Sequence, residues 1–177
     1  MPEPEPLIVL DSSVAFDLIN GRLILEVQSL PNVFAVPDIL FEEEFDEKTK
    51  EEISKLDLVI MEFNETQVNE AIDLKAIYSR PSVIDLFALI GAKDNRAILL
   101  TGDSELRQAA KEKGLTVHGT LWVIDELVLR TILIPARAAH ALREIIIQGS
   151  YLPQDECIQR FRTWGETREF WQDLYEI

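Results

Sequence analysis

The chain has 177 residues, of which 47% are hydrophobic and 28% are charged, a composition typical of a globular protein that can bury one substantial core. Its 17 basic and 32 acidic residues give a formal net charge of −15, which excludes a protein that coats nucleic acid by general phosphate neutralisation. Any contact with RNA is therefore expected to be local or assisted by a metal ion, and a basic protein is an expected partner.

Five short apolar runs alternate with helical patterns along the first two thirds of the chain. Continuous apolar runs of this length suit strands that are covered on both faces, as in a parallel sheet. The expected strands span residues 7–10, 33–36, 58–61, 97–100 and 115–117, and helical patterns begin near residues 12, 23, 37, 48, 64, 82 and 104. The helix that Asn64 caps is expected to turn Val68, Ile72 and Leu74 inward. This alternation predicts an α/β fold with a five-stranded parallel sheet flanked by helices.

The character of the chain changes after Gly119. Residues 1–118 carry the alternating pattern, whereas residues 119–177 are expected to be entirely helical, with no flexible linker before them. We therefore predict an all-helical C-terminal extension packed on the same domain. The extension carries two apolar stripes, formed by Leu121, Ile124, Leu127 and Val128 and by Ala138, Leu142, Ile145 and Ile146. A dimer interface or a groove for a partner is the alternative use of these stripes.

Three aspartates stand where the predicted elements begin or end. Asp11 follows the first strand, Asp103 follows the fourth, and Asp85 lies at the start of the helix that Ser82 caps. In doubly wound sheets the first and fourth strands are commonly neighbours, and sites form outside the carboxyl ends of strands. Grouped carboxylates repel one another unless a cation binds between them, and Mg²⁺ and Mn²⁺ prefer oxygen ligands. Each aspartate could instead serve only as a helix cap.

Other sites fit the sequence less well. A haloacid-dehalogenase-like phosphatase needs a second aspartate two residues after the first, where this chain has Ser13, and an integrin-type metal site needs a serine where it has Ala15. His118 and His140 are isolated, so neither a zinc site nor a histidine-based triad is predicted. No apolar run approaches the roughly 20 residues of a membrane-spanning helix, and the lone Cys157 fits a reducing compartment. We expect a cytoplasmic protein with no membrane contact.

Four segments in order, LIVLDSSV, VPDILFEEE, PSVIDLFALIGAK and ILLTGDSELRQAA, resemble the four acidic motifs of a PIN domain. The helical part beginning GTLWVIDELVLRTILIP resembles a PIN subfamily with a helical C-terminal extension, so the resemblance covers nearly the whole chain. It implies a Mg²⁺- or Mn²⁺-dependent ribonuclease. Bacterial and archaeal members of the family are often toxins of VapBC-type toxin–antitoxin pairs, which implies a basic antitoxin as a partner, and a homodimer is expected because mutually packed PIN dimers are common.

The resemblance implies a site residue by residue. Asp11, Glu43, Asp85 and Asp103 would be the metal-binding acids, with Ser12 beside the first. A metal-activated water would attack the RNA phosphate in line, leaving a 5′-phosphate and a 3′-hydroxyl.

Glu43 has two acidic neighbours, Glu42 and Glu44, that must be weighed against it. It is preferred because related motifs place the acid six residues after the proline, here Pro37. Glu43 is also expected at the edge of the inward face of its helix, whereas its neighbours would be solvated.

Arg80 and Arg107 are the basic residues expected to contact the substrate. The alternative function is a PIN-fold protein that binds RNA or a partner protein without efficient cleavage. The negative charge favours this alternative, whereas the presence of all four acids argues against it.

Overall fold

The computed structural model describes residues 5–175. Residues 1–4 of the predicted α/β segment and residues 176–177 of the predicted helical extension lie outside this range. A five-stranded, all-parallel sheet has the strand order β3-β2-β1-β4-β5. The strands are β1 (Ile8–Leu10), β2 (Phe34–Pro37), β3 (Val59–Met61), β4 (Ile98–Leu100) and β5 (Val117–His118). The predicted α/β fold with a five-stranded parallel sheet is confirmed, and the first and fourth strands are neighbours as expected.

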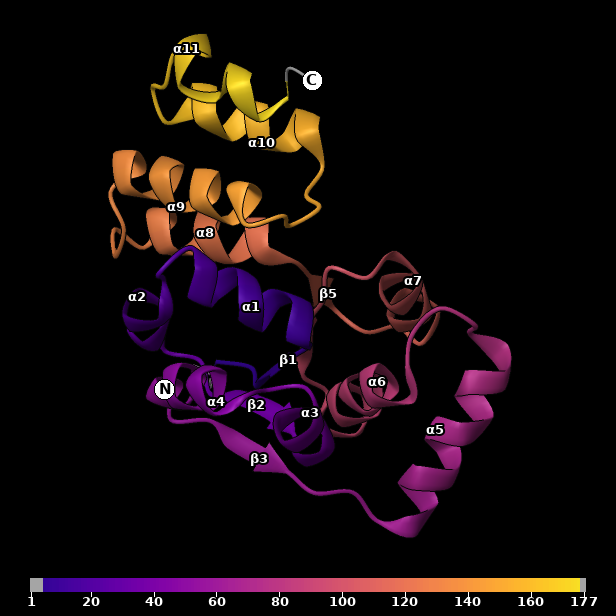
Figure 1. The fold of residues 1–177 in the computed structure, drawn as a ribbon. Coiled ribbons are helices and arrows are strands. Elements are labelled where there is room, and N and C mark those ends of the chain that lie inside the picture. The colour runs from indigo at the N-terminus through magenta and orange to yellow at the C-terminus, as the bar shows by residue number, and fades with distance from the viewer. Residues whose placement is uncertain (1–4, 176–177) are drawn as a thin grey trace.

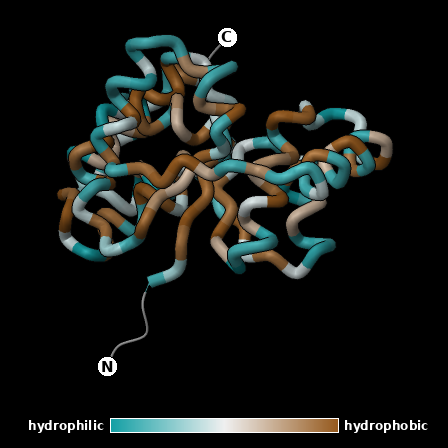
Figure 2. Tube along the Cα trace, turned by 90° about the horizontal axis from the view of Figure 1, so that it is seen from below, coloured by the Kyte–Doolittle hydropathy of each residue, from teal (hydrophilic) through white to brown (hydrophobic). Residues whose placement is uncertain are grey.

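The central strands are buried on both faces. Ile8 and Leu10 face one hydrophobic cluster and Val9 faces the other, and all three have no exposed surface. Leu99 and Leu100 divide between the two clusters in the same way. Because neither face is solvated, the sequences of these strands are unbroken apolar runs and do not alternate between apolar and polar residues. Figure 2 shows hydrophobic segments running through the centre of the molecule, with hydrophilic segments dominating its outer loops.

Helices cover both faces of the sheet (Figure 1). Those that pack on the face of Ile8 and Leu10 are α1 (Ser12–Asn20), α2 (Ile24–Gln28), α4 (Glu47–Ile53) and the short η1 (Ser54–Leu56). Those on the face of Val9 are α5 (Glu65–Ile77), α6 (Val83–Asn95) and α7 (Ser104–Glu112). The short α3 (Asp38–Glu43) follows β2 and contributes Leu40 to the first cluster.

The C-terminal helices stack in layers on α1, away from the sheet (Figure 1). They are α8 (Thr120–Leu129), α9 (Pro135–Ile147), α10 (Gln154–Thr163), α11 (Arg168–Trp171) and η2 (Gln172–Leu174). Their apolar side chains belong to the same hydrophobic cluster as Ile8 and Leu10 of β1. Arg160 of α10 forms an ion pair with Asp125 of α8, with 2.6 Å between Nη2 and Oδ2. Within residues 5–175, none of the helices is both long and apolar enough to cross a membrane.

One prediction about α5 is wrong. Val68 and Ile72 are 39% and 56% exposed, whereas Leu74 is buried as expected, together with Ala71. The reason is that α5 packs mainly against α6 rather than against the sheet. A helix that lies on another helix buries only a narrow stripe, so apolar residues beside that stripe remain in solvent.

Candidate active site

The carboxyl ends of β1 and β4 meet at one edge of the sheet. Leu10 pairs with Leu100 in register, so the residues that follow them, Asp11 and Thr101, leave the sheet side by side. The backbone confirms this, because the N–H of Asp11 donates to the carbonyl oxygen of Leu100 at 2.9 Å. The candidate site is built around this pair.

Asp11 is almost completely buried, with 2% of its surface exposed. Its Oδ2 accepts hydrogen bonds from the hydroxyl of Thr101 at 2.6 Å and from that of Ser13 at 2.9 Å. Burial raises the pKa of the Asp11 carboxyl to about 6, the hydrogen bond from Thr101 opposes this, and the negative charge of Asp85 adds to the rise. The charged form of a buried carboxylate next to a second negative charge is unfavourable, and a bound cation would stabilise it.

Asp85 occupies the first turn of α6 in the predicted position. Its Oδ2 accepts from the backbone N–H of Ser82 at 2.6 Å, and its own N–H donates to the Ser82 hydroxyl at 3.0 Å. This reciprocal capping box confirms the predicted helix start. It also fixes the side chain so that its negative charge acts on Asp11.

Asp103 is the N-cap of α7, as its position in the sequence predicts. Its Oδ1 accepts from the N–H of Leu106 at 2.7 Å, and its own N–H donates to the Thr101 hydroxyl at 3.0 Å. Thr101 therefore links Asp11 and Asp103 through one hydroxyl group. Asp103 both caps α7 and belongs to the candidate site. The helix-cap role and the metal-site role predicted from the sequence are therefore compatible.

Sequence reasoning missed Thr101 and Ser13. Besides its bond to Asp11, Ser13 Oγ accepts from the N–H of Gly102 at 3.0 Å, which closes a ring of hydrogen bonds between the ends of β1 and β4. A polar residue immediately after an apolar strand that neighbours the strand of Asp11 is the signal that could have identified Thr101.

Glu43 is exposed on α3, and none of the interactions in residues 5–175 links it to the three aspartates. Glu42 is exposed as expected and forms an ion pair with Lys50 at 2.7 Å. Glu44 is half-buried rather than solvated. The structure thus brings the three aspartates to one edge of the sheet, and no hydrogen bond or ion pair in the described part joins Glu43 to them.

The other predicted site residues differ in how they are held. Ser12 Oγ lies 3.5 Å from Asp11 Oδ1, a long contact. Arg80 is exposed just before α6, and its backbone N–H donates to Glu105 Oε2 at 2.7 Å. Arg107 is half-buried, and its Nη2 donates to the carbonyl oxygen of Thr101 at 2.7 Å. Arg107 therefore braces the end of β4.

A match to a known protein family identifies the fold that carries this site. The family described as PIN domain (DUF3368) matches residues 7–166. The chain belongs to the PIN-domain family. No curated protein and no solved structure gives a match. PIN domains are generally nucleases and generally use divalent metal ions, so at this coarse level the chain has a nuclease-type fold.

The chemistry of the PIN-domain aspartates fits a hard divalent cation. After the hydrogen bonds within the protein are counted, Asp85 Oδ1 and Asp103 Oδ2 accept none in the described part, and Asp11 Oδ1 has only the weak contacts with Ser12. Carboxylate oxygens are the ligands that Mg²⁺ and Mn²⁺ prefer. Among residues 5–175, however, no three Asp, Glu, His or Cys side chains lie close enough to form a ready metal site.

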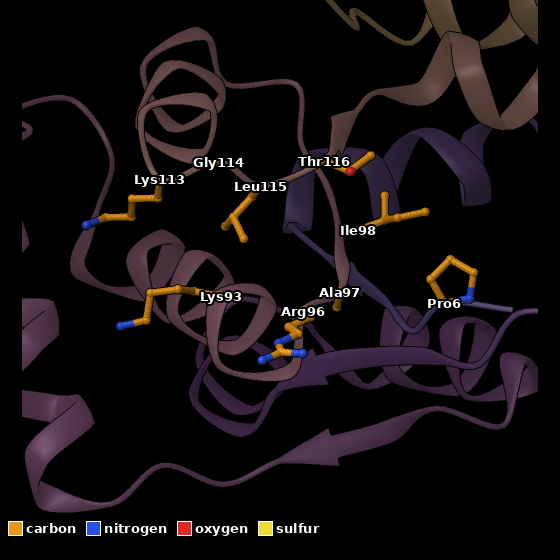
Figure 3. Close-up of a pocket in the computed structure, with 9 residues that line it drawn as sticks. All are labelled: Pro6, Lys93, Arg96, Ala97, Ile98, Lys113, Gly114, Leu115 and Thr116. Atoms are coloured by element: carbon orange, nitrogen blue, oxygen red, sulfur yellow. The ribbon is translucent and has the colours of Figure 1, made fainter. Parts of the chain in front are cut away.

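A hollow of about 430 Å³ in this PIN domain lies at the opposite end of β4 (Figure 3). The side chains of Lys93 and Lys113 extend to the same side of it, and Arg96 lies at the end of α6. Lys93 forms an ion pair with Glu70. Cations at the carboxyl ends of helices interact favourably with the helix dipole, which gives these residues a structural role. We place the candidate site at the aspartates, because ligands bind outside the carboxyl ends of parallel strands.

Proposed function

We propose that this PIN domain is a Mg²⁺- or Mn²⁺-dependent ribonuclease that hydrolyses phosphodiester bonds of RNA beside Asp11, Asp85 and Asp103. The observation that supports this most directly is the buried carboxylate of Asp11, whose pKa is raised to about 6 by burial with the Asp85 charge acting on it. Carboxylates whose pKa values are shifted by burial and by a neighbouring charge cluster at functional sites, which supports placing the site here.

Each residue has a role in the proposal. The three aspartates would hold the ion, which would supply a nucleophilic water and neutralise charge on the phosphate. Hydrogen bonds from Thr101 and Ser13 fix Oδ2 of Asp11 and thereby set the orientation of Oδ1. Glu43 enters the proposal only through the resemblance of its motif.

We assign the binding of RNA phosphate to Arg80. Its side chain is exposed, its guanidinium has no hydrogen-bond partner among residues 5–175, and it precedes the helix that carries Asp85. Since the whole chain carries a net charge of −15, such a local cation and a bound metal ion would have to overcome the general repulsion of RNA. The same negative charge supports a basic antitoxin as the partner, if the protein is the toxin of a pair.

The direct test is cleavage of mixed RNA substrates with Mn²⁺, with Mg²⁺ and with EDTA. Wild type and Asp103→Asn are compared with Asp73→Asn, which removes the same charge from the exposed outer side of α5. We expect metal-dependent cleavage that yields 5′-phosphate and 3′-hydroxyl ends, is lost in Asp103→Asn and is retained in Asp73→Asn. Cleavage that survives EDTA or the Asp103→Asn change would contradict the proposal.

A second candidate, an RNA- or protein-binding module without efficient cleavage, rests on one observation. The acidic side chains of residues 5–175 do not form a ready group of three metal ligands. Thermal unfolding separates the two candidates, because a cation that binds only the folded state must raise the melting temperature. A wild-type protein that binds RNA but shows neither a metal-induced shift nor cleavage would favour the binding module.

A further inference from the structure

A hollow of about 320 Å³ is lined in part by Ser13, which donates a hydrogen bond to Asp11, and by Gly102, which precedes Asp103. We call it the Tyr151 hollow; its walls come from α1, from the turn after β4 and from the loop between α9 and α10, and include Ser13, Phe16, Asn20, Gly102, Gln148 and Tyr151. The hydroxyl of Ser13, one of these wall residues, donates to Asp11 at 2.9 Å and accepts from Gly102 at 3.0 Å. The hollow is thus separated from the candidate metal-binding carboxylate by a single hydrogen bond.

Two aromatic side chains stand at this hollow in contact with solvent. Tyr151 is 100% exposed, and Phe16 is 38% exposed. The ring of Phe16 packs edge-on against the buried Phe45, with 5.6 Å between centroids, so it is held in place. Large aromatic rings that face solvent next to a nuclease-type site offer stacking surfaces for bases, and stacking of this kind tolerates any base.

The polar groups of the hollow suit the edge of a base rather than a phosphate. Asn20 and Gln148 each offer an amide that can both donate and accept, and neither side-chain amide is hydrogen-bonded within the described part of the chain. No lysine or arginine is among the residues that line the hollow. An uncharged ligand with donors and acceptors on its edge therefore fits better than an anion.

The loop that carries Tyr151 is anchored, although the tyrosine ring is free. Asp17 of α1 is buried and accepts hydrogen bonds from the side chains of Ser150 and Thr120, the latter at 2.5 Å. Ser150 immediately precedes Tyr151, so this carboxylate ties the loop to the helix that begins beside Asp11. A fixed backbone lowers the ordering cost of binding.

From these observations we propose that the Tyr151 hollow binds one nucleobase of single-stranded RNA next to the cleaved phosphate, with the base stacked on Tyr151 and its edge toward Asn20 and Gln148. This assignment rests on the proposed ribonuclease function, because it takes the ligand class from that function.

The test measures equilibrium binding of a labelled single-stranded RNA in Mg²⁺, in the Asp103→Asn background where no cleavage is expected. Tyr151→Ala should weaken binding roughly 10-fold, and Tyr151→Phe should stay within about 2-fold of the parent, because the phenyl ring retains the stacking surface. Leu129→Ala, which also truncates an exposed apolar side chain but on α8, should have no effect. An oligonucleotide with abasic ribose at every position carries the same charge and should bind Tyr151→Ala and its parent equally.

Each result decides the proposal separately from the ribonuclease function. Equal RNA affinity of Tyr151→Ala and its parent, or an equal loss with the abasic chain, overturns the base site. A Tyr151-dependent preference for RNA with bases, in a protein whose wild type cleaves nothing, supports the base site and overturns the ribonuclease. If the wild type cleaves, Tyr151→Ala should raise KM roughly 10-fold and change kcat much less, because the tyrosine does not touch the reacting phosphate.

Discussion

The hydroxyl of Thr101 donates a 2.6 Å hydrogen bond to the carboxylate of Asp11, across two strands that are neighbours in the sheet but distant in the chain. The same hydroxyl accepts from the N–H of Asp103. One small side chain therefore sets the relative positions of two of the three aspartates in the candidate site. It does so without adding a charge, which leaves the net negative charge of the site available to a cation.

Replacement of Thr101 by valine should weaken both the fold and the site. Valine has nearly the same shape but removes the hydroxyl, leaving the buried Asp11 carboxylate with one fewer donor and the Asp103 N–H without its acceptor. We expect a loss of about 1–3 kcal/mol in the free energy of unfolding, measured with urea, and weaker Mg²⁺ binding. Thr101→Ser keeps the hydroxyl and should cost about 1 kcal/mol or less. Equal effects of the two changes would show that the hydrogen bonds do not matter.

Asp11→Asn should stabilise the metal-free protein while abolishing its response to metal. Asparagine avoids the cost of burying a charge, and its oxygen can still accept from Thr101 and Ser13. Since burial raises the Asp11 pKa to about 6, the free energy of unfolding at pH 7.5 in EDTA should rise by about 1–3 kcal/mol. The melting temperature should no longer increase with Mg²⁺. A variant that is less stable than wild type in EDTA would refute this account.

Asp17 should make the wild type less stable as the pH rises. Burial raises the pKa of its carboxyl, whereas the unfolded chain keeps the ordinary value near 3.8. Between the two values the folded state binds more protons than the unfolded state, so stability falls as pH increases through that interval. Asp17→Asn removes this loss and keeps an acceptor for Thr120, so its melting temperature should match wild type near pH 3.5 and exceed it at pH 8. The charge-matched Asp73→Asn variant should show no such pH-dependent difference.

Alanine substitutions should distinguish Arg80, which is expected to bind RNA, from Arg107, which is expected to stabilise the end of β4. Arg80→Ala should leave the melting temperature unchanged but weaken RNA binding and lower the salt slope of affinity by about one. Arg107→Ala removes the donor to the Thr101 carbonyl and should cost about 1–2 kcal/mol of unfolding free energy. Thermal unfolding and RNA binding at two salt concentrations distinguish the residues.

Gly119 provides an independent check of the bracing role. A Cβ at this position would lie 2.8 Å from Arg107 Nη2, so Gly119→Ala should displace the guanidinium. Because the guanidinium is the far end of a flexible side chain and can move, the cost in stability should not exceed that of Arg107→Ala. A cost larger than that of Arg107→Ala would show that displacement of the guanidinium does not account for the effect.

The strands and the positions of Asp85 and Asp103 could be predicted because they depend on local chemistry. Apolar runs mark the strands, and Ser82 and Asp103 precede helices with the residue types that cap them. The prediction for Val68 and Ile72 fails because periodicity identifies an apolar face without identifying what covers it. The partner of α5 is another helix, and only the tertiary structure shows this.

Thr101 and Tyr151 illustrate a second limit of the sequence. The role of Thr101 depends on the register of β1 against β4, and Tyr151 lines a hollow together with residues of α1 because α9 packs on α1. Glu43 marks a third limit, because three consecutive glutamates share one local pattern. Its assignment depends on the spacing of the motif alone.

The core shared by β1 and the C-terminal helices has a consequence for the newly made chain. Helix α1, which covers β1, packs in turn against α8 and α9, and these two helices are synthesised after all five strands. Domains generally fold as units during synthesis, so a chain that stops near residue 119 would present an uncovered apolar face. We expect the aspartates to reach their final arrangement only after translation of the helical part is complete. Such timing would keep the proposed site inactive until its helical part has been made.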